Sequence, residues 1–223
     1  MHSATARVGV VVSAPFSENT YIAHLEGRQD CLVIDPGLEP DEIVRYLEEH
    51  ELTPAAILIT HGHSDHIAGN AYLKERYPDC PIVVSELDAP KLTDPALNLS
   101  AAFGVALYSP PGEVIVREGD TYSAAGFDLE VQAIPGHSIG HVVFIWRGAQ
   151  PIVVFGGDVL FSGSIGRTDF PDGSFEQLEE GIHHKLFTLP DNTQILPGHG
   201  PATTIGAEKR GNPFVGMPAG YRP

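Results

Sequence analysis

Residues 55–66 read AAILITHGHSDH, an apolar run followed at once by a dense group of polar side chains. Five consecutive apolar residues, 55–59, are typical of a strand that is buried on both faces. The polar part, 60–66, begins where such a strand would end, and it contains three histidines and one aspartate. Imidazole and carboxylate groups are ligands for transition metals. The stretch therefore predicts a metal site at the end of a buried strand rather than an ordinary solvated loop.

The composition limits the classes of partner. The chain has 223 residues, of which 42% are hydrophobic and 19% are charged, and these proportions are ordinary for a globular enzyme. With 13 basic and 29 acidic residues, the net charge is −16 when the histidines are neutral. Such an acidic surface repels phosphate backbones and anionic lipids, so we expect neither nucleic acid nor a membrane as a partner.

The cysteines and the N-terminus bear on the compartment. Cys31 and Cys80 form no Cys-x-x-Cys pair, and we interpret both as free or buried thiols of a reducing compartment, neither disulfide-bonded nor metal ligands. No apolar run approaches the length of about 18 residues that a membrane span needs. Residues 1–7 lack the apolar segment of a secretory signal. A cytoplasmic location is therefore the expectation.

Hydrophobic patterning predicts strands and helices in both halves of the chain. The predicted strands are 8–12, 20–25, 31–34, 55–59, 81–85, 113–117, 121–124, 127–133, 142–146, 151–155 and 193–196. Helical spacing of apolar residues predicts helices over about 40–50, 67–77 and 174–187. A β-rich segment followed by helices occurs twice, which predicts an α/β protein with two sheets packed face to face and helices outside.

The segment 93–111 has no clear pattern, because Ser, Asn, Gly and Pro are interspersed among Leu, Ala and Phe. A long irregular segment within a compact domain is often functional, and this one would then border a cleft. A surface connection without a role is the equal alternative.

Further stretches repeat the layout of an apolar strand followed by a polar turn. They are 127–133 followed by IPGHSIGH (134–141), 151–155 followed by GGD (156–158), and 193–196 followed by PGHG (197–200). Each has an ionisable side chain just beyond a strand, next to glycine, which lets the backbone approach closely. Strand ends gathered at one rim would form a single cluster of ligands.

In this order, THGHSDH, PGHSIGH, GDVLF and PGHG resemble the motifs of the metallo-β-lactamase fold superfamily, and within it the glyoxalase II group. The motifs span residues 60–200, most of the chain, and together in family order they are specific. The resemblance implies a four-layer αββα sandwich in which two mixed sheets pack face to face. It also implies a single domain over residues 1–223.

The resemblance further implies a role for each matching residue. The implied ligands are His61, His63 and His141 for one metal ion, Asp65, His66 and His199 for a second, and Asp158 as the bridge between them. Every position carries the expected residue type, which argues against an inactive member. His137 matches a motif position outside this set, and we expect it to orient a ligand or to line the cleft. Zinc is the expected ion, with iron or manganese as alternatives, because these ligand types accept all three.

Two divalent ions roughly 3.5 Å apart can share a water, lower its pKa and so supply a hydroxide nucleophile at pH 7. The same ions can polarise a substrate carbonyl and stabilise the oxyanion that forms. Asp65 would accept a hydrogen bond from the hydroxide and aim it, which makes it the expected catalytic residue. The reaction implied by the resemblance is hydrolysis of a small-molecule thioester, S-lactoylglutathione or a related compound.

Arg167, in the stretch GRTDF at 166–170, falls where glyoxalase II enzymes carry a basic residue that contacts glutathione. An arginine can bind a carboxylate through two hydrogen bonds, so we expect Arg167 to bind substrate. An ordinary structural ion pair is the alternative. Asp169 departs from the tyrosine that the larger enzymes of this group carry there.

Only 24 residues follow His199, since 223 − 199 = 24. The larger glyoxalase II enzymes have a helical C-terminal domain that supplies much of the glutathione site, and we expect none here. The tail, about 205–223, is expected to be short and irregular. The chain therefore resembles the short, single-domain glyoxalase II-like hydrolases, whose cleft should be more open.

A second reading belongs to another reaction class. GRTDF also resembles the persulfide dioxygenases, which oxidise glutathione persulfide with a single iron, and His61, His141 and Asp158 would match the iron ligands. The intact PGHG at 197–200 supplies a histidine for a second ion and favours the dinuclear hydrolase. A lactonase or β-lactamase shares the ligands but finds no support around Arg167.

Overall fold

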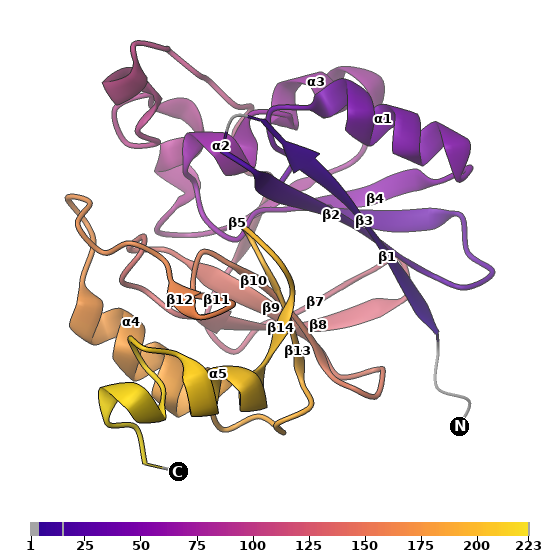
Figure 1. Cartoon of the computed structure of the whole chain (residues 1–223). Coiled ribbons are helices and arrows are strands. Elements are labelled where there is room, and N and C mark those ends of the chain that lie inside the picture. The colour runs from indigo at the N-terminus through magenta and orange to yellow at the C-terminus, as the bar shows by residue number, and fades with distance from the viewer. Residues whose placement is uncertain (1–4, 15, 223) are drawn as a thin grey trace.

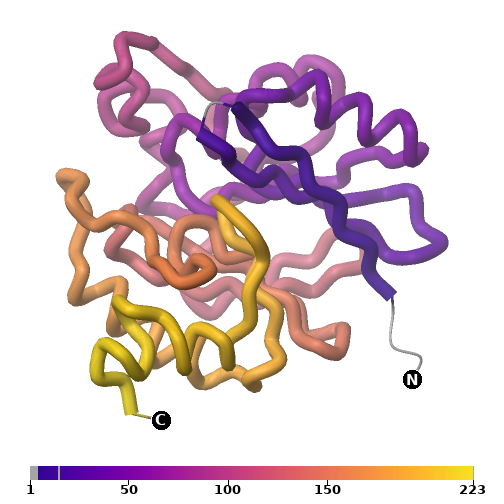
Figure 2. The backbone as a smooth tube through the Cα atoms, in the orientation of Figure 1, coloured from indigo at the N-terminus to yellow at the C-terminus, as the bar shows by residue number. Residues whose placement is uncertain are grey.

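The protein is described by a computed structural model that covers residues 5–14 and 16–222. Two six-stranded sheets lie face to face, and helices cover the outer face of each sheet (Figure 1). The chain up to residue 116 supplies the first sheet, and the chain from residue 121 supplies the second (Figure 2). The expected four-layer αββα sandwich of two mixed sheets is confirmed.

The first sheet combines an antiparallel meander with parallel strands. Its strands, in spatial order, are β1 (Ala6–Ser13), β2 (Glu18–Leu25), β3 (Asp30–Ile34), β4 (Thr53–Leu58), β5 (Ile82–Ser85) and β6 (Val114–Val116). The pairs β1–β2 and β2–β3 are antiparallel, whereas β3–β4, β4–β5 and β5–β6 are parallel. Parallel neighbours need a crossover connection. The crossovers carry α1 (Pro40–Glu49), α2 (Ser64–Ile67), α3 (Asn70–Arg76), and the short 3₁₀ turns η1 (Ala89–Thr93) and η2 (Ser100–Phe103).

The second sheet is antiparallel except for one pair. Its strands, in spatial order, are β14 (Thr203–Thr204), β13 (Gln194–Pro197), β10 (Val153–Gly157), β9 (Val142–Trp146), β8 (Phe127–Ala133) and β7 (Thr121–Ala124). The pair β10–β13 is parallel, and its crossover carries a small ribbon and a helix. These elements are β11 (Leu160–Phe161), β12 (Ser164–Ile165), α4 (Phe175–Gly181) and the π-helical turn η3 (Ile182–Leu186). The chain ends with α5 (Ile205–Gly211) and η4 (Met217–Ala219).

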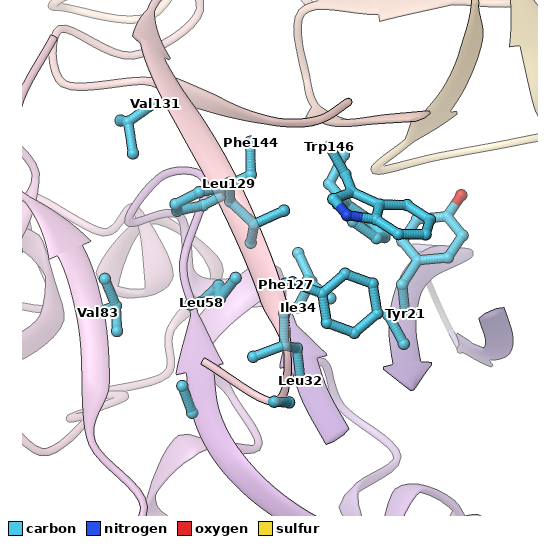
Figure 3. Close-up of a cluster of buried hydrophobic side chains, with 14 of the residues drawn as sticks. Tyr21, Leu32, Ile34, Leu58, Val83, Phe127, Leu129, Val131, Phe144 and Trp146 are labelled. Carbon is cyan, nitrogen blue, oxygen red and sulfur yellow. The ribbon is translucent and has the colours of Figure 1, made fainter. Parts of the chain in front are cut away.

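Alternating side chains of the central strands separate three apolar cores. In β4, Ala56 and Leu58 point into the core between the sheets, while Ile57 points into the core under the helices. The core between the sheets joins strands of both halves of the chain, and Phe127, Phe144 and Trp146 face the β2, β3 and β4 side chains across it (Figure 3). A third core lies between the second sheet and the helices α4 and α5. A strand buried on both faces explains the continuous apolar run at 55–59.

Three sequence-based predictions differ from the structure. The predicted helix 67–77 begins later, as α3 (Asn70–Arg76), and the separate turn α2 (Ser64–Ile67) precedes it. The predicted helix 174–187 changes from α to π geometry at Ile182. The tail expected to be irregular over 205–223 contains α5, because the Thr204 hydroxyl accepts a hydrogen bond from Ala207 N–H and Ile205 is fully buried. A cap and one buried side chain outweigh a composition rich in glycine and proline.

The ends of several strands meet at one rim of the sandwich. Val142 N–H donates to the Thr60 carbonyl at 2.9 Å, which joins the start of β9 to the end of β4. Asn19 N–H donates to the Gly198 carbonyl at 2.7 Å, which joins β2 to the turn after β13. The parallel register pairs Gly157 with Pro197. The motif turns of both sheets are thereby held side by side. No helix within residues 5–14 and 16–222 is long and apolar enough to cross a membrane.

Candidate metal centre

Three histidines form the first group of ligand atoms. His137 Nε2 lies 2.9 Å from His63 Nδ1 and 3.2 Å from His61 Nε2. All three side chains are buried, and their ligand atoms lie within 4.8 Å of one another. His137 Nδ1 lies 2.9 Å from the carbonyl oxygen of Arg167. A proton on Nδ1 satisfies that carbonyl, so the lone pair of His137 Nε2 faces the other two rings.

Asp65, His66 and His199 form the second group, and their ligand atoms also lie within 4.8 Å of one another. The outward nitrogen of each ring has an acceptor. His66 Nδ1 lies 3.1 Å from Asp35 Oδ2, and His199 Nδ1 lies 3.0 Å from the Phe16 carbonyl oxygen. The two Nε2 atoms face the Asp65 carboxylate, at 3.8 Å for His66 and 3.4 Å for His199, and they are the ring atoms that would bind a cation.

Asp158 lies between the two groups. Its Oδ2 atom is 3.4 Å from His137 Nε2 and 3.5 Å from His199 Nε2, while Oδ1 is 3.5 Å from His66 Nε2. The Asp158 carboxylate is therefore within reach of ions held by either group.

These residues fit a pair of metal ions. His66 Nε2 and Asp158 Oδ1 are buried and have no hydrogen-bond partner among the described residues. A native structure rarely leaves buried polar atoms unpaired, because each costs about 1–3 kcal/mol. The donor set, imidazole nitrogens with two carboxylates, suits zinc, iron or manganese. Bound cations would satisfy the unpaired atoms and neutralise the carboxylates.

The positions of His137 and His141 differ from those expected from the sequence, because the structure groups His137 with His61 and His63. His141 Nε2 accepts a hydrogen bond from Asp158 N–H at 2.9 Å, and its ring stacks on His61 with centroids 4.8 Å apart. His141 is thus buried behind the site and holds the backbone of Asp158. Because the ligand atom of His137 lies with those of His61 and His63, we propose His137 in place of His141 as the third ligand of this group. The residues lie four apart in one glycine-rich turn, and their spacing alone carried no signal to separate them.

The protonation equilibria of the histidines differ between the groups. Burial, reinforced by the neighbouring rings, lowers the pKa values of His61 and His63 well below the usual range. Burial also acts to lower the pKa of His66, but the carboxylates of Asp158, Asp65 and Asp35 outweigh it and raise that pKa. His61 and His63 are therefore neutral and ready to bind a cation, whereas a metal ion has to displace a proton from His66.

Asp35 is a supporting residue that lies outside the sequence motifs. Its Oδ2 atom faces His66 Nδ1, and it also accepts the Thr60 hydroxyl at 2.6 Å, while Oδ1 accepts Thr60 N–H at 2.8 Å. Asp35 thereby fixes both the ring of one ligand and the start of the ligand loop. The signal that could have identified it is a carboxylate at the end of the buried strand β3.

Asp88 is a second supporting residue, and no motif pointed to it. Its carboxylate accepts Gly62 N–H at 2.8 Å, Gly140 N–H at 2.9 Å and the Ser138 hydroxyl at 2.7 Å. The loop with His61 and His63 is thus tied to the loop with His137. Lys91 Nζ extends the network, because it donates to Ser138 Oγ at 2.5 Å and to Asp172 Oδ2 at 2.6 Å.

A cleft of about 360 Å³ opens over these groups. Apolar side chains surround the ligands, and they belong to Phe16, Leu99, Phe103, Phe161, Ile165 and Phe170. Arg167 also lines the cleft, with its guanidinium 4.4 Å from the centre of the Phe170 ring and both Nε and Nη2 at 2.7 Å from Asp169. Arg167 thus combines a position in the cleft with the ion pair that was the alternative. The segment 93–111 borders the cleft through Asn98, Leu99 and Phe103.

Comparison with known proteins places this site in a family. A family model described as the metallo-beta-lactamase superfamily matches residues 14–199. The chain is 39% identical over 202 residues to the probable metallo-hydrolase YqgX of Bacillus subtilis, covering 90% of this chain and 93% of that one. It is 38% identical over 192 residues to the hydroxyacylglutathione hydrolase GloC of Haemophilus influenzae, covering 85% of this chain and 89% of that one.

Solved structures agree over nearly the whole chain. The BLEG-1 B3 metallo-beta-lactamase superposes with a TM-score of 0.89 at 33% identity, over 94% of this chain and 99% of that one. TTHA1623 in a di-iron-bound form gives 0.80 at 39% identity, over 92% and 99%. ETHE1 from Myxococcus xanthus gives 0.77 at 30% identity, over 95% and 85%. With its motifs, its four-layer fold and its paired ligand groups, the chain belongs to the metallo-β-lactamase superfamily.

Proposed function

We propose that this protein is a dinuclear metal-dependent hydrolase of thioesters, similar to glyoxalase II. The observation that carries the proposal is the position of Asp158 between two complete groups of ligand atoms, within 3.5 Å of His137, His66 and His199. The name of the GloC relative, a hydroxyacylglutathione hydrolase, supports a thioester of the glutathione type as substrate.

In this proposal one ion is held by His61, His63 and His137 and the other by Asp65, His66 and His199, with Asp158 shared. Two bound divalent ions supply an activated water at neutral pH and polarise the scissile carbonyl. Zinc is the ion we expect, and the di-iron form of TTHA1623 supports iron as an alternative.

Asp65 is the residue of the chain best placed to orient the attacking water. Its carboxylate lines the cleft and lies 3.4 Å from His199 Nε2. Burial acts to raise the pKa of Asp65, but His66 and His199 outweigh burial and hold the pKa well below its usual range. Asp65 is therefore ionised at neutral pH and accepts the hydrogen bond that aims the water. The thiolate that leaves is stable near neutral pH, so no strong general acid is required.

The alternative is a persulfide dioxygenase with a single iron. The similarity to ETHE1 supports it. The second group of ligand atoms favours the hydrolase, because Asp65, His66 and His199 converge as closely as the three histidines of the first group do.

The test combines metal analysis with two activity assays on the pure protein. We expect close to two divalent ions per chain and release of glutathione from S-lactoylglutathione. One iron per chain, with oxygen uptake on glutathione persulfide and no thioester hydrolysis, would reverse the ranking. Metal-loaded protein that hydrolyses neither substrate would reject both readings.

A further inference from the structure

A second hollow of about 260 Å³ adjoins the cleft on its Asp65 side. The two hollows share Phe16, Ser64, Asp65 and Phe103, so they are continuous. The side chains found only in the second one belong to Leu38, Ser100, Val105 and Leu107. Neither His137 nor Arg167 is among its lining residues. The second hollow therefore begins at Asp65, in the second ligand group, and lies on the side of the cleft away from Arg167.

Phe16 and Phe103 stand between the two hollows. Their rings meet edge to face, with centroids 5.6 Å apart, although the two residues come from distant parts of the chain. Both are unusually accessible for phenylalanine, at 43% and 65% of their surface, and Val105 next to them is 56% exposed. Contiguous exposed apolar side chains beside a catalytic cleft mark a surface that binds an apolar group.

The charges around the cleft do not favour substrate selection mainly through anionic groups. Of the 13 lysines and arginines in the chain, all within the described residues, Arg167 alone lines the cleft. Its guanidinium already has a carboxylate partner in Asp169. Lys91, the nearest buried cation beneath the site, is bound to Asp172 and Ser138. The cleft therefore offers few free basic side chains to pair with the two carboxylates of a glutathione moiety. Apolar contacts then have to supply much of the selectivity for substrate.

We propose that the second hollow is a subsite for an apolar acyl group, and that the preferred substrates are thioesters whose acyl chain is longer and less polar than lactoyl. The inference rests on the proposed thioesterase function. With the thiol portion on the Arg167 side, the acyl chain extends past Asp65 and under the Phe16–Phe103 pair. The side chains of Leu38, Val105 and Leu107 would cover it.

The size of the effect follows from apolar burial. Full burial of a methylene group corresponds to about a fourfold change in a binding or specificity constant. Because the hollow is partly open, about twofold per methylene is the expected gain. S-Hexanoylglutathione has four methylenes more than S-acetylglutathione, so its kcat/KM should be at least about tenfold higher with the metal-loaded enzyme.

Two variants separate the subsite from general effects of a surface charge. Phe103→Asp should reduce the hexanoyl-to-acetyl ratio of kcat/KM to about twofold or less. Phe214→Asp is the matched control, since Phe214 is 47% exposed and does not line either hollow; it should keep the wild-type ratio. A ratio near one for the wild type, or an unchanged ratio for Phe103→Asp, would overturn the proposal.

A binding readout distinguishes failure of the subsite from failure of the proposed function. Calorimetry of the metal-loaded protein should give S-hexylglutathione a Kd at least about tenfold lower than S-methylglutathione, and Phe103→Asp should remove the difference. Preference for the hexyl compound without any thioester hydrolysis would retain the apolar subsite and reject the thioesterase. Hydrolysis of both esters, with equal affinity for both thioethers, would retain the thioesterase and reject the apolar subsite.

Two further experiments test whether the apolar group that occupies the subsite is the acyl chain, the thiol portion or a second copy of the protein. The first compares kcat/KM for S-acetylhexanethiol and for S-hexanoylglutathione, each relative to S-acetylglutathione. If the increase is larger for S-acetylhexanethiol, the subsite binds the thiol portion and the acyl assignment is wrong. If sedimentation shows a wild-type dimer that Phe103→Asp dissociates, the exposed apolar surface belongs to a second copy and the proposal fails.

Discussion

His137 Nε2 lies 2.9 Å from Nδ1 of His63 in a fully buried setting. The other ring nitrogen of His137 faces a backbone carbonyl, which places its proton there and its lone pair toward His63. Three histidines thus direct nitrogen atoms into one small space with Asp158 at its edge. A shared cation would account for this convergence, and we therefore propose His137 rather than His141 as the third ligand of the first group.

The proposed roles of these two histidines lead to the first prediction. His137→Asn should lower the metal content of the protein from about two ions to about one per chain, because a direct ligand is lost. His141→Asn should keep about two ions and weaken their binding by about 10–100-fold, the usual effect of losing a group that supports a ligand. Elemental analysis and competition with a chelator measure both quantities. Equal loss of metal in the two variants would contradict the assignment.

Asp158→Ala tests the bridge. Because the Asp158 carboxylate faces histidines of both groups, its removal should reduce the content of both ions and abolish activity. Circular dichroism serves as the control for folding, and metal analysis after gel filtration gives the result. A full metal complement in the folded variant would show that the two ions need no common ligand.

Asp88→Asn tests the support beneath the loops. The side chain is fully buried and accepts hydrogen bonds from two backbone N–H groups and a hydroxyl, with Lys91 Nζ at 3.4 Å. Removing its charge leaves a buried lysine with one partner fewer, which should lower the free energy of unfolding by about 3 kcal/mol in urea denaturation. Glu86→Gln is the control, because the pair of Glu86 with Arg117 is exposed and worth about 0–1 kcal/mol. Similar losses in both variants would rule out a special role for Asp88.

The cysteines give a prediction that depends on pH. Burial is the largest cause that raises the pKa of Cys31 and Cys80, in each case to about 12. At pH 8 the folded protein then holds only about one thiolate in ten thousand thiols, and iodoacetamide should not modify it within an hour. In the unfolded chain the thiols titrate near pH 8.5, so their contribution to stability is lost progressively as the pH rises from there toward 12.

Mass spectrometry before and after denaturation in guanidinium checks this. Two carbamidomethyl groups should be added only in the denaturant. Rapid modification of the native protein at pH 8 would show that the thiols are accessible. The free state of both cysteines, expected from their spacing, is confirmed.

Much of the fold could be predicted because it rests on local patterns. The apolar run 55–59 is a strand whose two faces contact two different cores, and such a strand needs apolar residues at every position. The other motif turns were also recognisable, since each follows an apolar strand. Helix α5 was missed because its stability comes from the Thr204 cap and from burial of Ile205, a tertiary contact that composition does not reveal.

The parts of the site that were missed depend on contacts between distant segments. Asp88 supports loops that lie 26 and 52 residues away from it along the chain. Asp35 similarly faces His66 across 31 residues. Which of His137 and His141 joins the first group of ligand atoms depends on the orientation of the turn 134–141, and the pairing of β8 with β9 fixes that orientation. Local sequence identifies which residue types can bind a metal, whereas the packing of the two sheets decides which of them do.

The most direct test is anomalous diffraction from crystals of the metal-loaded protein. We expect two peaks about 3.5–4 Å apart, one against His61, His63 and His137 and the other against Asp65, His66 and His199, with the Asp158 carboxylate between them. A single peak, or a first ion bound to His141 in place of His137, would contradict this expectation.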